Sequence, residues 1–187
     1  MKGEISLKDK NIVVCVTGGI AAYKVVNLVS MLKKQGADVT VILTENAAKF
    51  VAPITFQSIS SNLVYMNIFD DRYSADIKHI SLAQNADLVV IAPATANIIG
   101  KIANGIADDM ISTTVMATNA PVIIVPAMNT AMYENPIVQH NISRLKEFNY
   151  TFMIPGVGSM AMPSEKGGIG RLPEPDKIFD YINNFDF

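Results

Sequence analysis

Two segments of the sequence, 88–91 (LVVI) and 122–125 (VIIV), are apolar at every position. A strand with one face in water alternates polar and apolar residues, so segments without alternation predict strands that are covered on both faces. The β-branched segments 11–17, 38–43 and 150–154 extend the pattern, and segments with helical spacing separate them. The sequence therefore predicts one α/β domain over residues 1–187, with a Rossmann-like (flavodoxin-like) parallel sheet and helices on both faces.

The helical segments carry start and stop signals. Lys33 and Lys34 suit the last turn of a first helix, and Gly36 suits the position just after its end. Asn135 and Pro136 are a typical helix start. We also expect helices over 108–117 and 176–184, with Asp108 and Asp109 as capping residues. Residues 67–77 and 155–175 have little periodicity and are predicted to be loops.

Composition excludes several classes of function. Charged residues make up 17% of the chain and the net charge is −2, so no basic field exists for nucleic acid. This charged share is below the usual value of about 25%, which suggests apolar surface buried against other subunits. No signal peptide or membrane span is visible, so we expect a cytoplasmic protein without a membrane partner. One cysteine, Cys15, and two histidines, His79 and His140, argue against disulfides and a metal centre.

A glycine turn follows the first predicted strand. Gly18 and Gly19 let the backbone approach a ligand closely, and the next helix presents N–H groups to an anion. The turn matches neither a dinucleotide fingerprint nor a P-loop. After the second strand, the Thr44 hydroxyl suits a phosphate group. Glu45 beside it would suit the ribose of NAD, so NAD remains an alternative ligand. A packing turn without any ligand is an equal alternative.

Small and polar residues follow the buried strand at 88–91. Open parallel sheets bind ligands at the carboxyl ends of their strands. Thr95 and Asn97 therefore form a polar ledge that suits the hydrogen-bonding edge of a ring system. The simpler alternative is an ordinary helix cap.

The segment 126–136, PAMNTAMYENP, resembles the signature of the flavin-dependent cysteine decarboxylases. That family includes phosphopantothenoylcysteine decarboxylases and the peptidyl-cysteine decarboxylases of lantibiotic maturation. Further matching segments occur in the family's order at 16–24, 41–51, 79–83, 91–109 and 170–175. The resemblance is strongest to the decarboxylase half of the bacterial bifunctional coenzyme A enzyme.

This resemblance implies FMN as the cofactor and a homotrimer or homododecamer with FMN at the subunit interfaces. It implies FMN contacts at Gly18, Gly19, Ile20, Thr44, Thr95, Ala96, Asn97, Ile98 and Ala127. It also implies acid–base catalysis by His79, carboxylate binding and catalysis by Asn129, and substrate contacts at Met132 and Met162, with residues 155–175 covering the substrate. Because the sequence ends at Phe187, we expect no ligase domain and a separate phosphopantothenate–cysteine ligase as a candidate partner.

The implied reaction is oxidation before decarboxylation. Hydride loss from the cysteine Cβ gives a thioaldehyde, whose C=S group accepts the electron pair when CO₂ leaves. In coenzyme A synthesis, phosphopantothenoylcysteine then becomes phosphopantetheine, because the resulting enethiol is reduced. In lantibiotic maturation the enethiol is the product. A flavin-binding regulatory protein without turnover is the third hypothesis.

One departure from the family pattern bears on the last step. The phosphopantothenoylcysteine decarboxylases carry a proton-donating cysteine in the long loop, and Met162 stands in its place here. A thioether has no proton to donate. Cys15 lies in the first predicted strand and is no substitute. The sequence therefore predicts that oxidative decarboxylation is retained while the final reduction is impaired.

Overall fold

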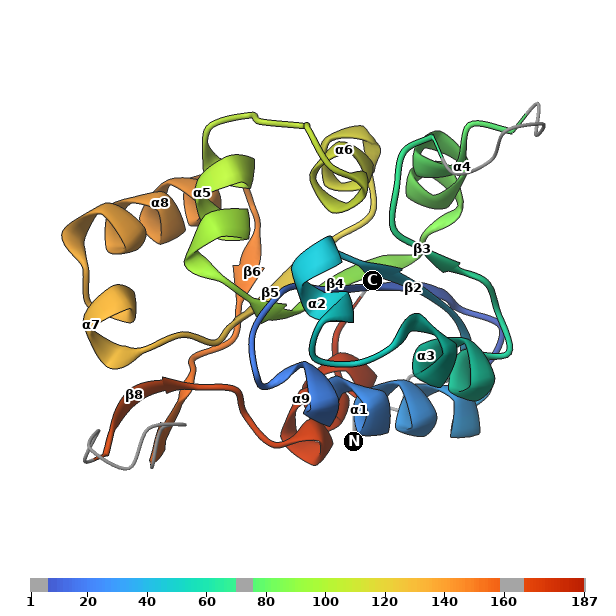
Figure 1. Cartoon of the computed structure of the whole chain (residues 1–187), viewed down its shortest axis with the longest axis horizontal. Coiled ribbons are helices and arrows are strands. Elements are labelled where there is room, and N and C mark those ends of the chain that lie inside the picture. The colour runs from blue at the N-terminus through green and yellow to red at the C-terminus, as the bar shows by residue number, and fades with distance from the viewer. Residues whose placement is uncertain (1–6, 70–75, 159–166, 187) are drawn as a thin grey trace.

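The computed structural model of the chain describes residues 7–69, 76–158 and 167–186. A parallel sheet lies between two layers of helices (Figure 1). Its strands are β1 (Asn11–Val16), β2 (Asp38–Leu43), β3 (Val64–Tyr65), β4 (Leu88–Ala94), β5 (Val122–Pro126) and β6 (Thr151–Phe152). The helices are α1 (Ala22–Lys34), α2 (Glu45–Ala48), α3 (Pro53–Ser60), α4 (Lys78–Asn85), α5 (Ala96–Ala103), α6 (Met110–Ala117), α7 (Thr130–Tyr133), α8 (Pro136–Glu147) and α9 (Pro175–Asn183).

The strand order of the sheet is β3-β2-β1-β4-β5-β6, and every neighbouring pair is parallel. This is the Rossmann-type order, in which the chain first winds outward in one direction and then in the other. The predicted fold class is therefore confirmed. The direction reverses between β1 and β4, so the first turn and the segment after β4 lie side by side at the carboxyl edge of the sheet.

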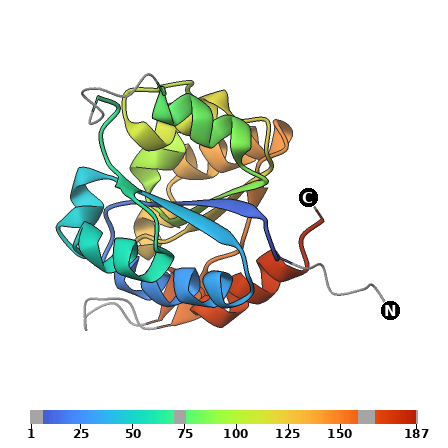
Figure 2. The same ribbon diagram turned by 90° about the vertical axis from the view of Figure 1, so that its right-hand side faces the viewer.

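Alternate residues of each strand enter two separate cores. Ile12, Val14 and Val16 of β1 pack with α1, α3 and α9 on one face, whereas Val13 and Cys15 pack with α5, α6 and α8 on the other. Figures 1 and 2 show these two helical layers on opposite sides of the sheet. Burial on both faces explains why the central strands are apolar at every position.

The predicted helix signals act as expected. Gly36 has a φ of +86°, a conformation that favours glycine after a helix end. The Asn135 side chain accepts a hydrogen bond from the Ile137 N–H at 2.9 Å, and Pro136 begins α8. Asp109 caps α6 and forms a capping box with Ser112. Among the residues that the structure describes, no helix is long and apolar enough to cross a membrane.

The prediction of a structureless segment over 155–175 is wrong in part. Strands β7 (Gly156–Gly158) and β8 (Gly168–Arg171) pair in antiparallel fashion, and α9 begins at Pro175. Each short strand has two glycines and a single large apolar side chain, so a periodicity argument does not reveal the pairing. Tertiary contacts hold β8, since the Met128 N–H donates to the Gly170 carbonyl at 2.9 Å.

Candidate functional site

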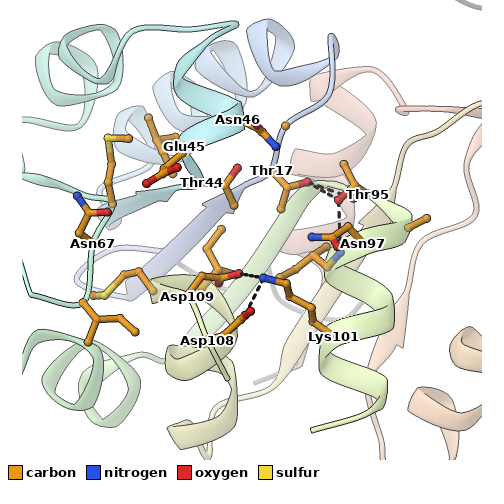
Figure 3. Close-up of a pocket in the computed structure, with 18 of the residues that line it drawn as sticks. Thr17, Thr44, Glu45, Asn46, Asn67, Thr95, Asn97, Lys101, Asp108 and Asp109 are labelled. Atoms are coloured by element: carbon orange, nitrogen blue, oxygen red, sulfur yellow. Dashed lines mark hydrogen bonds and ion pairs between the residues drawn. The ribbon is translucent and has the colours of Figure 1, made fainter. Parts of the chain in front are cut away.

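A cavity of about 680 Å³ opens at the carboxyl edge of the sheet, where the strand order reverses. This volume lies within the range of small-molecule and cofactor sites. Its wall includes the residues after β1, β2, β3 and β4 and the first turn of α6 (Figure 3). Residues predicted from the sequence that line the cavity are Gly18, Thr44, Thr95, Ala96, Asn97, Ile98 and Met132.

Thr17 joins the two halves of the sheet at this edge. Its hydroxyl donates to the Pro93 carbonyl at 2.6 Å and accepts from the Thr95 N–H at 3.1 Å. Thr17 is 1% exposed, so its hydroxyl has little access to water. Thr17 therefore fixes the position of the Thr95–Asn97 ledge relative to the glycine turn. The sequence places Thr17 at the end of the first predicted strand but does not reveal this role.

Replacing Thr17 with valine keeps the shape of the side chain but removes both hydrogen bonds. We expect Thr17→Val to lower the free energy of unfolding by about 1–3 kcal/mol, because a buried donor and acceptor lose their partner. Thr17→Ser keeps the hydroxyl and is the matched control. Chemical denaturation measures both variants, and equal stability of Thr17→Val and wild type would show that the bridge contributes nothing.

Thr44 and Thr95 both cap helices that begin at the cavity. Thr44 Oγ1 accepts from the Ala47 N–H at 3.1 Å, and Thr95 Oγ1 accepts from the Ile98 N–H at 3.4 Å. The capping alternative for Thr95 is thus correct in geometry. A capping hydroxyl still has its own hydrogen. Each threonine can therefore cap its helix and donate to a ligand oxygen.

Gly18 is required by close packing between the first turn and α2. A Cβ atom at this position would lie 2.4 Å from Asn46 Cβ and 3.1 Å from the Asn46 carbonyl carbon. At neighbouring Gly19, the nearest atom to an added Cβ is Pro93 Cγ at 3.8 Å, an ordinary contact. Only the first glycine is needed to bring the β1 turn against α2 at the cavity wall.

A charged cluster that sequence analysis did not identify as a site lines the opposite wall. Lys101 Nζ lies 2.6 Å from Asp108 Oδ1 and 2.7 Å from Asp109 Oδ2 (Figure 3). Hydrogen bonds to Asp108 and Asp109 raise the pKa of Lys101. Burial raises the pKa of Asp109, but hydrogen bonds from Lys101 and Ser112 outweigh burial and lower that pKa overall. Asp108 does not cap α6, so its predicted capping role is wrong and its partner is Lys101.

Several predicted site residues lie outside the lining of this cavity. Gly19, Ile20 and Ala127 are not among its lining residues, and the Ile20 side chain is 55% exposed. Asn129 Oδ1 accepts from the Ala131 N–H at 2.8 Å and thereby caps α7. The substrate-binding role of Asn129 stays a prediction. Met162 lies outside the described residues.

His79 lies in α4 and is not among the described residues that line the cavity. Its Nδ1 atom is buried and has no hydrogen-bond partner within the described part of the chain. An unpartnered polar atom in a buried position is costly, and such atoms often mark functional positions. In the described part of a single chain, His79 is therefore not a lining residue of the cavity.

The other lining residues that were not predicted from the sequence lie in two places, on α5 and after β2 and β3. Lys101 lies one helical turn after Asn97, so both reach the same cavity, and a spacing of four residues was the available signal. Asn46, Asn67 and the apolar wall at Met66, Ile68 and Phe69 follow β2 and β3. Because β3 has only two residues, the sequence did not show that a strand ends there.

The fold and cavity together define a doubly wound α/β protein with a cofactor-sized site at its topological switch point. A model of the family described as Flavoprotein matches residues 2–186, and the chain belongs to this family.

Two relatives and two solved structures show the similarity. The chain is 50% identical over 172 residues to the coenzyme A biosynthesis bifunctional protein CoaBC of Bacillus subtilis, covering 92% of this chain and 42% of that protein. It is 43% identical over 176 residues to CoaBC of Escherichia coli K12, covering 94% of this chain and 43% of that protein. The chain thus spans less than half the length of these relatives.

The solved structures match almost the whole chain. A PPC decarboxylase mutant complexed with pantothenoylaminoethenethiol superposes with a TM-score of 0.83 at 28% identity, covering 94% of this chain and 97% of that chain. The epidermin biosynthesis protein EpiD from Staphylococcus aureus gives a TM-score of 0.80 at 28% identity, with 92% and 99% covered.

Proposed function

We propose that this protein is an FMN-dependent carboxy-lyase that removes the cysteine carboxyl group of phosphopantothenoylcysteine, the decarboxylation on the route to phosphopantetheine in coenzyme A biosynthesis. The observation that carries the proposal is the cavity itself. Within it lie Gly18, Thr44 and the Thr95–Ile98 segment, which the family resemblance assigns to FMN. The similarity to CoaBC proteins and to PPC decarboxylase supports the substrate. The cytoplasmic location expected from the sequence is part of this proposal.

The residues at the cavity fit FMN. The hydroxyls of Thr44 and Thr95 and the amides of Asn46 and Asn97 offer neutral donors to phosphate and carbonyl oxygens. Apolar side chains at Met66, Ile68 and Met110 offer a surface for an aromatic ring. The volume of about 680 Å³ leaves space beyond a flavin for part of a substrate.

When bound, FMN supplies the oxidation of the cysteine Cβ–S unit that makes loss of CO₂ feasible. The chain's own residues bind, orient and handle protons. Asn129 is assigned to the substrate carboxylate, because a neutral amide orients a carboxylate without stabilising it as strongly as a cation would. His79 is assigned to proton transfer, since imidazole takes up and releases protons near neutral pH.

The position of His79 favours a site shared between subunits. His79 is not among the described residues that line the cavity of its own chain, and we infer that it serves the cavity of a neighbouring copy in a homotrimer or a larger assembly. Large apolar side chains exposed at Ile20, Tyr23 and Ile137 support such an assembly, with exposed fractions of 55%, 59% and 71%. A separate ligase that supplies the substrate is part of the same proposal.

A peptidyl-cysteine decarboxylase is the second candidate, because Met162 replaces the loop cysteine expected for the final reduction. The similarity to EpiD is compatible with this reading. The two candidates differ in the substrate that loses CO₂. A protein that binds FMN but decarboxylates neither substrate would belong to the third, regulatory class.

Mass spectrometry of the products separates these candidates. We expect phosphopantothenoylcysteine to lose CO₂ and a cysteine-terminated peptide to remain unchanged. Because Met162 has no proton to give, we expect the product formed in the absence of oxygen to be the enethiol, which is two hydrogens short of the saturated thiol. Met162→Cys is expected to restore some saturated thiol.

Two outcomes contradict these expectations. Conversion of the peptide, but not of phosphopantothenoylcysteine, would replace the first candidate with the second. Stoichiometric saturated thiol from the unmodified protein would show that another group performs the protonation assigned to the missing cysteine.

A further inference from the structure

The described residues that line the cavity carry an excess of negative charge. Glu45, Asp108 and Asp109 contribute carboxylates, whereas Lys101 contributes the only cationic side chain among them. This balance is unusual for a site that takes a phosphorylated ligand, because a phosphate monoester carries about −1.5 to −2 charges at pH 7. The single lysine is therefore the residue on which the electrostatics of the cavity depend most.

The Lys101 ammonium is held in a defined position. It bridges Asp108 and Asp109 at 2.6 and 2.7 Å, and only 21% of its side chain is exposed. Asp109 is fixed in turn, because its Oδ1 accepts from the Ser112 N–H at 2.8 Å in the cap of α6. Figure 3 shows the Lys101 amine turned toward the two carboxylates at the cavity wall. The cluster is partly screened from solvent, so its charges act on a ligand more strongly than surface charges do.

We propose that Lys101 determines the preference of this cavity for a phosphorylated flavin over an unphosphorylated one, by offsetting the two carboxylates that hold it. This inference rests on the proposed binding of FMN. Without the ammonium, the carboxylates of Asp108 and Asp109 are uncompensated and make the potential of the whole cavity more negative, which disfavours a ligand that carries a phosphate. Riboflavin has the same ring and ribityl chain but no phosphate, so the same change affects it less.

A change of opposite sign distinguishes charge from structure. Asp108→Asn removes one negative charge, while its amide oxygen still accepts a hydrogen bond from Lys101. The Asp108 side chain is 58% exposed, so the substitution does not bury a new polar group. A cluster that matters only for packing loses ligand affinity in both variants. A cluster that acts by charge loses FMN affinity in Lys101→Met and gains it in Asp108→Asn.

The test is titration of the apoprotein with FMN and with riboflavin, with the quenching of flavin fluorescence as the measure of binding. We expect Lys101→Met to lower the ratio of FMN affinity to riboflavin affinity about tenfold, and Asp108→Asn to raise FMN affinity about threefold. Both effects are expected to shrink at about 0.5 M salt. Lys101→Arg keeps the charge and is expected to stay within about twofold of wild type.

Lys24 provides a matched control. It is also a partly buried lysine in an ion pair, with Glu174 at 2.8 Å, but it does not line the cavity. Lys24→Met is expected to leave the affinity ratio unchanged. Equal weakening of both flavins by Lys101→Met, or loss of FMN affinity in Asp108→Asn, overturns the inference while leaving the proposed function intact. A wild-type protein that binds neither flavin overturns both.

Discussion

Gly18→Ala is expected to destabilise the protein by about 1–3 kcal/mol and to abolish measurable FMN binding. The added Cβ lies 2.4 Å from Asn46 Cβ and 3.1 Å from the backbone of the same residue. These atoms belong to the start of α2, so the helix and the Thr44 cap beside it must shift away from the first turn. Thermal denaturation and retention of flavin during purification measure the two effects.

Gly19→Ala is the matched control, because an added Cβ there meets Pro93 Cγ at an ordinary 3.8 Å. We expect this variant to unfold close to the wild-type temperature. Wild-type stability and FMN content in Gly18→Ala would contradict the packing argument and the placement of the cofactor beside this turn.

His79→Asn is expected to retain FMN while decarboxylation falls by ~10²-fold or more, because general acid–base catalysis contributes about that much. His79 does not line the cavity of its own chain, so its loss leaves the predicted cofactor contacts intact. Turnover per bound FMN is the quantity to measure. His140→Asn is the control, since His140 is exposed on α8.

Mixing two inactive variants tests whether His79 acts across a subunit boundary. Gly18→Ala chains lack a functional cavity but supply His79, and His79→Asn chains supply the cavity. Co-expressed mixed assemblies are expected to regain part of the activity.

In the single-variant experiment, His79→Asn could instead lose FMN in parallel with activity, so that turnover per bound FMN is preserved. That result would show that His79 is a structural residue.

The central part of the fold could be predicted from the sequence because its signals are local. Residues 88–91 and 122–125 are apolar without alternation, and both form strands buried on two faces. Helix ends at Gly36 and Asn135 are marked by the residue types that their backbone geometry requires. These features do not depend on distant parts of the chain.

The short strand β3 and part of the site could not be predicted in this way. Strand β3 has two residues, too few to show a period, whereas β6 lies within the strand predicted over 150–154. Thr17 and Asp108 act through partners 76 and 7 residues away, respectively. Nothing in their local sequence identifies those partners. His79 illustrates the converse, because a motif identified it and the geometry of one chain does not explain its role.

Decarboxylation itself is tested most directly by supplying the FMN-loaded protein with phosphopantothenoylcysteine in the absence of oxygen. Released CO₂ is measured against bound FMN, and the product is weighed by mass spectrometry. Because the enethiol is the expected product and nothing reoxidises the flavin without oxygen, we expect about one CO₂ per bound FMN, together with a product that has lost its carboxyl group. A protein that retains FMN in full but leaves the substrate carboxylate intact would contradict the proposed function.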